Sequence, residues 1–134
     1  MTRRVALLLA TMAVMLVLGS GVALAGYFVG TRGGDTLRGT NNADEMYGLR
    51  GGDTLIGLGG KDYIEGGTGF DLIRGGNQDD KIYGGAGQDD IFGGDGDDFI
   101  NVADNGTVDT VDCGAGVDTV ITDGGDSIDA TTCP

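Results

Sequence analysis

The chain has 134 residues, of which 29 are glycine and one is proline, and it carries a formal net charge of −13 without any histidine. Its length accommodates one small domain. The glycine content is too high for an ordinary globular protein, and the absence of a three-residue period excludes collagen. The negative charge disfavours nucleic acid and anionic membranes as partners, and it favours cations.

Residues 1–25 have the pattern of a secretory signal peptide. Two arginines precede an apolar run over residues 5–18, and a small-x-small cleavage pattern ends at Ala25. Cleavage there would leave 6 basic and 21 acidic residues. A retained membrane anchor is the alternative, although an apolar run this short falls below the usual length of a bilayer span. We therefore expect a secreted, extracellular protein with no membrane span after cleavage.

A nine-residue phrase fills residues 30–101 in eight consecutive copies, without insertion or deletion. Each copy begins with glycine, has aspartate at its sixth position and has an apolar residue at its eighth. The aspartates are Asp35, Asp44, Asp53, Asp62, Asp71, Asp80, Asp89 and Asp98, and the apolar residues are Leu37, Met46, Leu55, Ile64, Ile73, Ile82, Ile91 and Ile100. A fixed short period of this kind indicates a solenoid.

Within each phrase the glycine-rich start predicts a turn, and positions seven to nine predict a three-residue strand whose middle side chain points inward. If every turn reverses the chain, two phrases form one coil, and residues 18 apart stack at about 4.8 Å. We expect an all-β fold, a parallel β-roll (a right-handed parallel β-helix solenoid) with two short-stranded parallel sheets. The eight copies, with a short lead-in, would form a unit over residues 26–101.

Residues 102–134 read as degenerate repeats that cap the solenoid. Asp109 and Asp118 keep the aspartate spacing of nine, and Asp126 continues it one residue early. Cys113 and Cys133 are the two cysteines of the chain. In an oxidising compartment they would form a disulfide that closes a loop of about 20 residues and stabilises by roughly 3 kcal/mol. Two free thiols or an intermolecular bridge remain the alternatives.

Stacking at 18 residues places the eight aspartates in two columns, one on each edge of the roll. Carboxylates held this close repel one another unless a cation lies between them. Carboxylates and turn carbonyls together supply the oxygen ligands that Ca²⁺ prefers, whereas softer metals would require histidine or cysteine. We expect six Ca²⁺ sites within the eight copies, further ligands at Asp109 and Asp118, and folding coupled to binding. Capping of local backbone N–H groups is the alternative role of the aspartates.

The phrase resembles G-G-x-G-x-D-x-U-x, the nonapeptide of the RTX, or haemolysin-type calcium-binding, family. The copies over residues 66–74, 84–92 and 93–101 fit it completely. The resemblance implies a parallel β-roll whose turns hold Ca²⁺ between consecutive coils, through the aspartates and turn carbonyls. The chain departs from the pattern at position four, in Asn42 and Gln78, which predicts distorted turns near these two residues. It also departs at position two of the first four copies, and we expect the N-terminal sites to be weaker than those among Asp71, Asp80, Asp89 and Asp98. The position-two departures are Thr31, Thr40, Leu49 and Leu58.

Catalysis has few candidate residues in this chain. It lacks histidine, and Ser127 is the only serine outside the predicted signal peptide, so base-assisted nucleophilic catalysis is disfavoured. We predict a non-catalytic calcium-binding module. The alternatives are an adhesion or partner-binding protein that uses the roll as a scaffold, and a minimal secreted hydrolase. A cell-surface or protein partner would meet outward-facing aromatic residues at Tyr47, Tyr83, Phe92 and Phe99, whereas ice binding is disfavoured because the position-seven columns are irregular.

Overall fold

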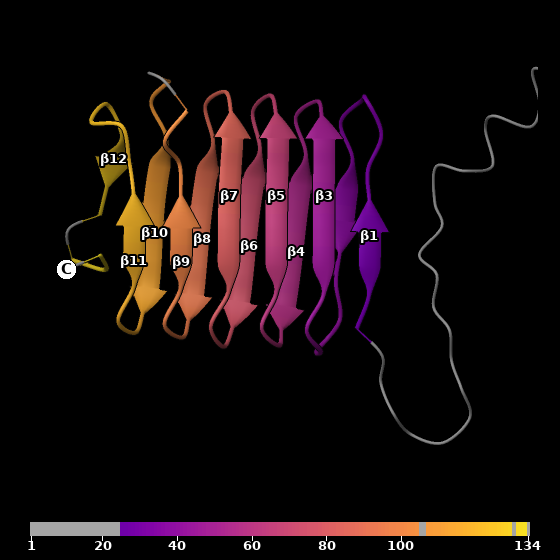
Figure 1. Ribbon diagram of the computed structural model, residues 1–134, viewed down its shortest axis with the longest axis horizontal. Helices are drawn as coiled ribbons and strands as arrows, with labels where there is room; N and C mark the ends of the chain where they lie inside the picture. Colours follow the sequence, from indigo (N-terminus) through magenta and orange to yellow (C-terminus); the bar gives the residue numbers. More distant parts are fainter. Residues whose placement is uncertain (1–24, 105–106, 130, 134) are drawn as a thin grey trace, which may run out of the picture.

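The computed structural model describes residues 25–104, 107–129 and 131–133, where it shows an all-β solenoid. The predicted signal peptide and the alternative anchor lie outside these residues, except for Ala25. Twelve strands form two six-stranded sheets, and every neighbouring pair of strands within a sheet is parallel. In Figure 1 one sheet lies in front of the other, and the strands of each sheet lie side by side along the molecule. In the ranges described, no helix is long and apolar enough to cross a membrane.

Successive strands alternate between the two sheets, so two strands and two turns make one coil. The odd sheet contains β1 (Tyr27–Val29), β3 (Glu45–Arg50), β5 (Tyr63–Thr68), β7 (Lys81–Ala86), β9 (Phe99–Asn101) and β11 (Thr119–Ile121). The even sheet contains β2 (Thr36–Arg38), β4 (Thr54–Gly59), β6 (Leu72–Asn77), β8 (Asp90–Asp95), β10 (Thr110–Ala115) and β12 (Ser127–Ile128). The result is a solenoid of about six turns, which confirms the predicted β-roll with its two parallel sheets.

The register follows the sequence period. Ile73 pairs with Leu55 on one side and with Ile91 on the other, each 18 residues away. Beyond β9 the spacing changes, because Ile91 pairs with Val111 and Val111 pairs with Ile128. The segment before β10 is thus two residues longer than a regular repeat, and the segment before β12 is one residue shorter. The degenerate repeats still extend both sheets.

The core is a single layer of side chains between the sheets. Side chains alternate along a strand, so the eighth position of each copy points inward while its neighbours face solvent. Leu37, in the first coil, is partly buried against this layer. The fully buried apolar members are Met46, Leu55, Ile64, Ile73, Ile82, Ile91, Ile100, Val102, Val111 and Cys113.

A disulfide between Cys113 and Cys133 closes the C-terminal end of the solenoid, as predicted. Their Cα atoms are 5.2 Å apart, and the bond spans 20 residues that include β11 and β12. Cys113 is fully buried at the end of the core layer. The bond therefore ties the last strands to the stack, where a solenoid has no further coil to hold them.

Truncating a core side chain tests this single-layer core. We expect Ile82→Ala to cost about 2 to 5 kcal/mol of unfolding free energy, because no second layer can fill the cavity. Urea unfolding in saturating Ca²⁺ measures the change. Ile121→Ala is the matched control, since Ile121 is 41% exposed and should cost less than about 1 kcal/mol. Equal costs for the two variants would contradict the assigned core.

Candidate metal centres

The predicted aspartates form two ladders, one along each turn edge. Each aspartate immediately precedes a strand, and its side chain points inward like the core residue two positions later. Asp35 and Asp118 are half-buried at or near the ends of the ladders. The buried members are Asp44, Asp53, Asp62, Asp71, Asp80, Asp89, Asp98 and Asp109. Ionised carboxylates that are stacked in a thin interior oppose folding.

One oxygen of each carboxylate joins consecutive coils. The backbone N–H of Asp53 donates to Oδ1 of Asp71 at 2.8 Å, and the N–H of Asp71 donates to Oδ1 of Asp89 at 2.9 Å. On the opposite edge the N–H of Asp62 donates to Asp80 Oδ1 at 2.8 Å. These bonds connect residues 18 apart, so most of the aspartates do not act as the local turn caps considered as the alternative.

The second oxygen of most of these carboxylates has no hydrogen-bond partner. Burying an ionised oxygen without a partner costs several times the gain from an ordinary hydrogen bond. A cation or a proton removes that cost. The buried Oδ2 atoms without a partner belong to Asp53, Asp62, Asp71, Asp80, Asp89, Asp98, Asp109 and Asp118.

The glycine that opens each copy leaves space beside this oxygen. A Cβ placed on Gly66 would lie 2.6 Å from Oδ2 of Asp71 and 2.5 Å from the carbonyl oxygen of Gly84, one coil further on. Two oxygens from consecutive coils therefore converge on a space that any side chain at position one would occupy. The same pair of oxygens, one Oδ2 and one carbonyl of the next coil, recurs beside Asp53, Asp62, Asp80 and Asp98.

Among the described residues, aspartate, glutamate, histidine and cysteine do not gather into a group of three or more that could hold a metal. The carboxylates instead occur in pairs, one coil apart. Any bound ion must therefore take much of its coordination from backbone carbonyls. That donor set, entirely of oxygen, fits Ca²⁺, and it does not fit the softer transition metals.

The first two copies differ from the rest. Oδ2 of Asp35 accepts hydrogen bonds from the backbone N–H and the hydroxyl of Thr31, at 2.6 and 2.9 Å. Oδ2 of Asp44 accepts from the N–H and the hydroxyl of Thr40, at 2.6 and 3.1 Å. Local capping, the alternative role, thus applies to these two aspartates. Their second oxygens are satisfied without a cation.

The turns also depart from what the sequence predicts. Gln78 has a φ of 77°, close to the 80° of Leu49 and the 83° of Leu58, so all three adopt the left-handed conformation. This conformation costs a residue with a Cβ roughly 1–2 kcal/mol, yet Gln78 does not distort the turn. The turn containing Asn42 does differ from the later turns, in line with the expected distortion, because neither Thr40 nor Asn42 has a positive φ.

Burial raises the pKa of the inner aspartates, because a charged carboxylate loses its water. The pKa of Asp80 rises to about 8 and that of Asp89 to about 7. The pKa values of Asp62, Asp98 and Asp109 rise to about 6. The hydrogen bond from the preceding coil lowers each pKa in part, and the neighbouring carboxylates raise it further. The middle of each ladder is therefore where a positive charge is most needed.

Comparison with known families agrees with this chemistry. A family model described as the RTX calcium-binding nonapeptide repeat matches residues 29–64, 38–73 and 65–100, which together span more than half of the chain. Repeats of this family bind Ca²⁺ as structural ions. The comparisons identify no catalytic family. Searches of curated proteins and of solved structures gave no match.

The raised pKa values predict how the calcium-free chain responds to pH. Each of these carboxylates binds its proton more tightly when folded than when unfolded, so its contribution favours folding at low pH and is lost as pH rises through about 6 to 8. In buffer stripped of calcium, we expect the β-sheet circular dichroism to increase between pH 8.5 and pH 5.5. A Ca²⁺-saturated sample is the control, without such a gain. A loss of sheet signal on acidifying the calcium-free chain would contradict the assignment.

Proposed function

Because the chain belongs to the RTX calcium-binding nonapeptide repeat family, we propose that it is a secreted, non-catalytic module that folds as it binds several Ca²⁺ ions between its stacked turns. The observation that carries this proposal is the set of eight buried carboxylate oxygens without a hydrogen-bond partner, four in each ladder. Ca²⁺ would supply the positive charge that these oxygens lack, while turn carbonyls complete its coordination.

The ligands are assigned from the two oxygens that converge beside position one. Five aspartates have both an unpartnered Oδ2 and a carbonyl of the next coil close to it: Asp53, Asp62, Asp71, Asp80 and Asp98. Asp89 and Asp109 extend one ladder, and Asp118 completes the other. Asp35 and Asp44 complete the first coil, where threonine already satisfies the second oxygen and a cation adds least.

Coupling of folding to binding follows from the charge of the ladders. In the unfolded chain the aspartates are hydrated and far apart, whereas the folded chain buries them in columns. An ion that binds only the folded state stabilises it in proportion to the logarithm of its concentration. Without Ca²⁺, the folded chain at neutral pH must either bury charge or take up protons. The unfolded state is then favoured.

This coupling suits an exported protein. Residues 1–25 would direct secretion with cleavage after Ala25, residues 26–101 would form the roll, and residues 102–134 would cap it. Cytosolic Ca²⁺ is too low to fold the chain, whereas millimolar Ca²⁺ outside the cell matches the range of extracellular modules. The disulfide at Cys113 also requires an oxidising compartment.

The proposal assigns no catalytic residue. The buried carboxylates bond to the backbone of neighbouring coils, which leaves them unsuited to proton transfer with a substrate. One second function has support of its own: a partner-binding scaffold, favoured by a continuous row of aromatic rings on the odd sheet.

Removing one ladder carboxylate tests the ligand assignment. Asp71→Asn preserves the shape of the side chain, but it removes the negative charge from the middle of one ladder. We expect it to lose at least one Ca²⁺ per chain and to weaken overall Ca²⁺ affinity by about tenfold or more, equivalent to about 1.4 kcal/mol. Isothermal titration calorimetry on the purified protein measures both quantities.

Asp90→Asn is the matched control. Asp90 lies at the start of β8 on the outer face of the even sheet, so the substitution removes the same charge without touching a ladder. It should leave the Ca²⁺ stoichiometry unchanged. The assignment is wrong if Asp71→Asn retains the full stoichiometry, or if the control loses as many ions.

A further inference from the structure

Five aromatic side chains form a continuous row on the outer face of the odd sheet. Tyr27, Tyr47, Tyr63, Tyr83 and Phe99 come from β1, β3, β5, β7 and β9, so each coil contributes one ring. Successive ring centroids are 5.7, 5.8, 5.5 and 5.9 Å apart. The rings alternate between two strand positions that lie two residues apart, and the row therefore zigzags across the strands.

The row already binds one cation from its own chain. The Lys81 ammonium lies 5.6 Å from the centroid of Tyr83 and 5.8 Å from that of Phe99. Both distances are within the range over which a positive charge is attracted to the face of an aromatic ring. Rings in this arrangement are thus suited to hold an ammonium or guanidinium group.

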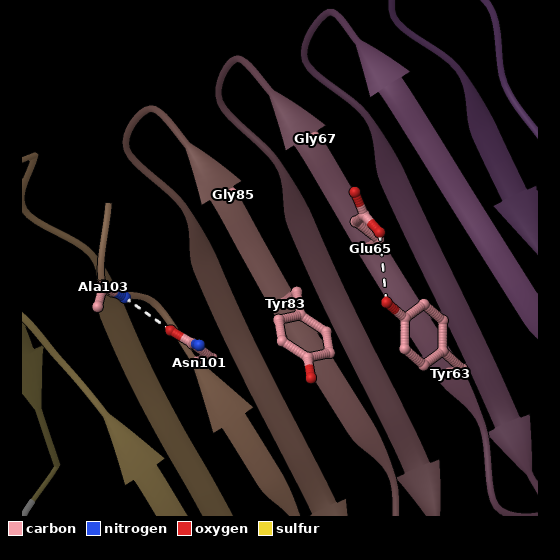
Figure 2. Close-up of a pocket in the computed structure, with 7 residues that line it drawn as sticks. All are labelled: Tyr63, Glu65, Gly67, Tyr83, Gly85, Asn101 and Ala103. Atoms are coloured by element: carbon pink, nitrogen blue, oxygen red, sulfur yellow. Dashed lines mark hydrogen bonds between the residues drawn. The ribbon is translucent and has the colours of Figure 1, made fainter. Parts of the chain in front are cut away.

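A hollow of about 250 Å³ lies along the row at Tyr63 and Tyr83, and Figure 2 shows its lining. Gly67, Gly85 and Ala103 line it at the turn side, where small residues leave the space open. Glu65 lies in the hollow, and in the sheet it pairs with Tyr47 on one side and Tyr83 on the other. Tyr63 donates to its carboxylate over 3.4 Å. Glu65 therefore has a tyrosine at the paired position on each neighbouring strand, and a third tyrosine donates a hydrogen bond to its carboxylate.

Glu65 forms no ion pair with any residue that the structure describes. Within that part of the chain, Lys61 and Asp79 form the only ion pair, and they lie on two turns that are one coil apart. Burial raises the pKa of the Tyr63 phenol, and the negative charge of Glu65 raises it further. The whole chain carries a net charge of −13. The hollow thus combines aromatic faces, a carboxylate that is hydrogen-bonded but not ion-paired, and a negative surrounding field.

We propose that this hollow binds a basic polypeptide partner, through an arginine side chain that stacks on Tyr63 and Tyr83 and donates hydrogen bonds to the Glu65 carboxylate. Arginine fits better than lysine, because its planar guanidinium stacks on rings and pairs with a carboxylate through two parallel hydrogen bonds. Further basic side chains of the partner would follow the row towards Tyr47 and Tyr27, where Glu45 supplies a second carboxylate. The opposite charges of the two proteins would also speed their association.

A hexa-arginine peptide is the probe, with binding to the Ca²⁺-saturated protein followed by fluorescence anisotropy. Glu65→Gln should weaken binding about tenfold, because it removes the charge from the hydrogen-bonded pair. Tyr83→Leu should weaken it about threefold to tenfold through the lost ring face. Asp90→Asn removes the same charge from the opposite sheet, and it should change affinity less than about twofold.

NMR chemical shifts locate the peptide independently, and we expect the largest changes at Tyr63, Glu65 and Tyr83. Glu65→Gln alters only a surface carboxylate, so it tests the proposal even if Tyr83→Leu impairs folding. Equal weakening by Asp90→Asn would show diffuse charge attraction and overturn the proposal. Binding of neutral cellohexaose along the row, with no binding of hexa-arginine, would overturn it in favour of a glycan surface. Because all measurements use folded protein, their outcome is independent of whether folding requires Ca²⁺.

Discussion

The stacking of the coils depends on the buried aspartate carboxylates of the two ladders. Each regular coil places two aspartates inside the solenoid, where one oxygen accepts a hydrogen bond from the preceding coil and the other has no partner. The same side chain therefore aligns the coils and opposes their stacking. A cation reverses the balance, because it attracts the free oxygen while leaving the hydrogen bond intact. The proposed calcium dependence therefore has its origin in the same repeat position that sets the architecture.

The remaining positions follow from that constraint. Glycine at position one is needed because a side chain would fill the space beside Oδ2, as at Gly66. The apolar residue at position eight gives the solenoid a core of one layer of side chains. The two ends of the solenoid differ from the middle. At the N-terminal end, Thr31 and Thr40 donate hydrogen bonds to the first two carboxylates, and at the C-terminal end a disulfide holds the last strands against the stack.

Strict periodicity made most of this predictable from sequence. A period of nine with alternating side chains suffices to derive the two sheets, the core column and the aspartate ladders. Interactions outside the period were missed. The hydroxyl of Thr31 was read only as a departure from glycine, although it bonds to Asp35. Tyr47, Tyr83 and Phe99 are predictable as outward-facing residues, but their continuous row is not. Tyr63 and Tyr83 occupy different repeat positions, so neither column looks regular alone. The sequence predicts a distorted turn at Gln78, but Gln78 adopts the left-handed backbone and the strands on either side keep their register with neighbouring coils.

The most direct test of the central claim is circular dichroism of the purified protein during a Ca²⁺ titration at pH 7.5, followed by excess chelator and compared with Mg²⁺. We expect a disordered spectrum without metal, a cooperative gain of β-sheet signal with Ca²⁺, reversal by the chelator and no comparable gain with Mg²⁺, whose octahedral preference does not fit these turns. A full β-sheet spectrum in the absence of metal, unchanged by Ca²⁺, would contradict the claim that the buried carboxylates make folding depend on calcium.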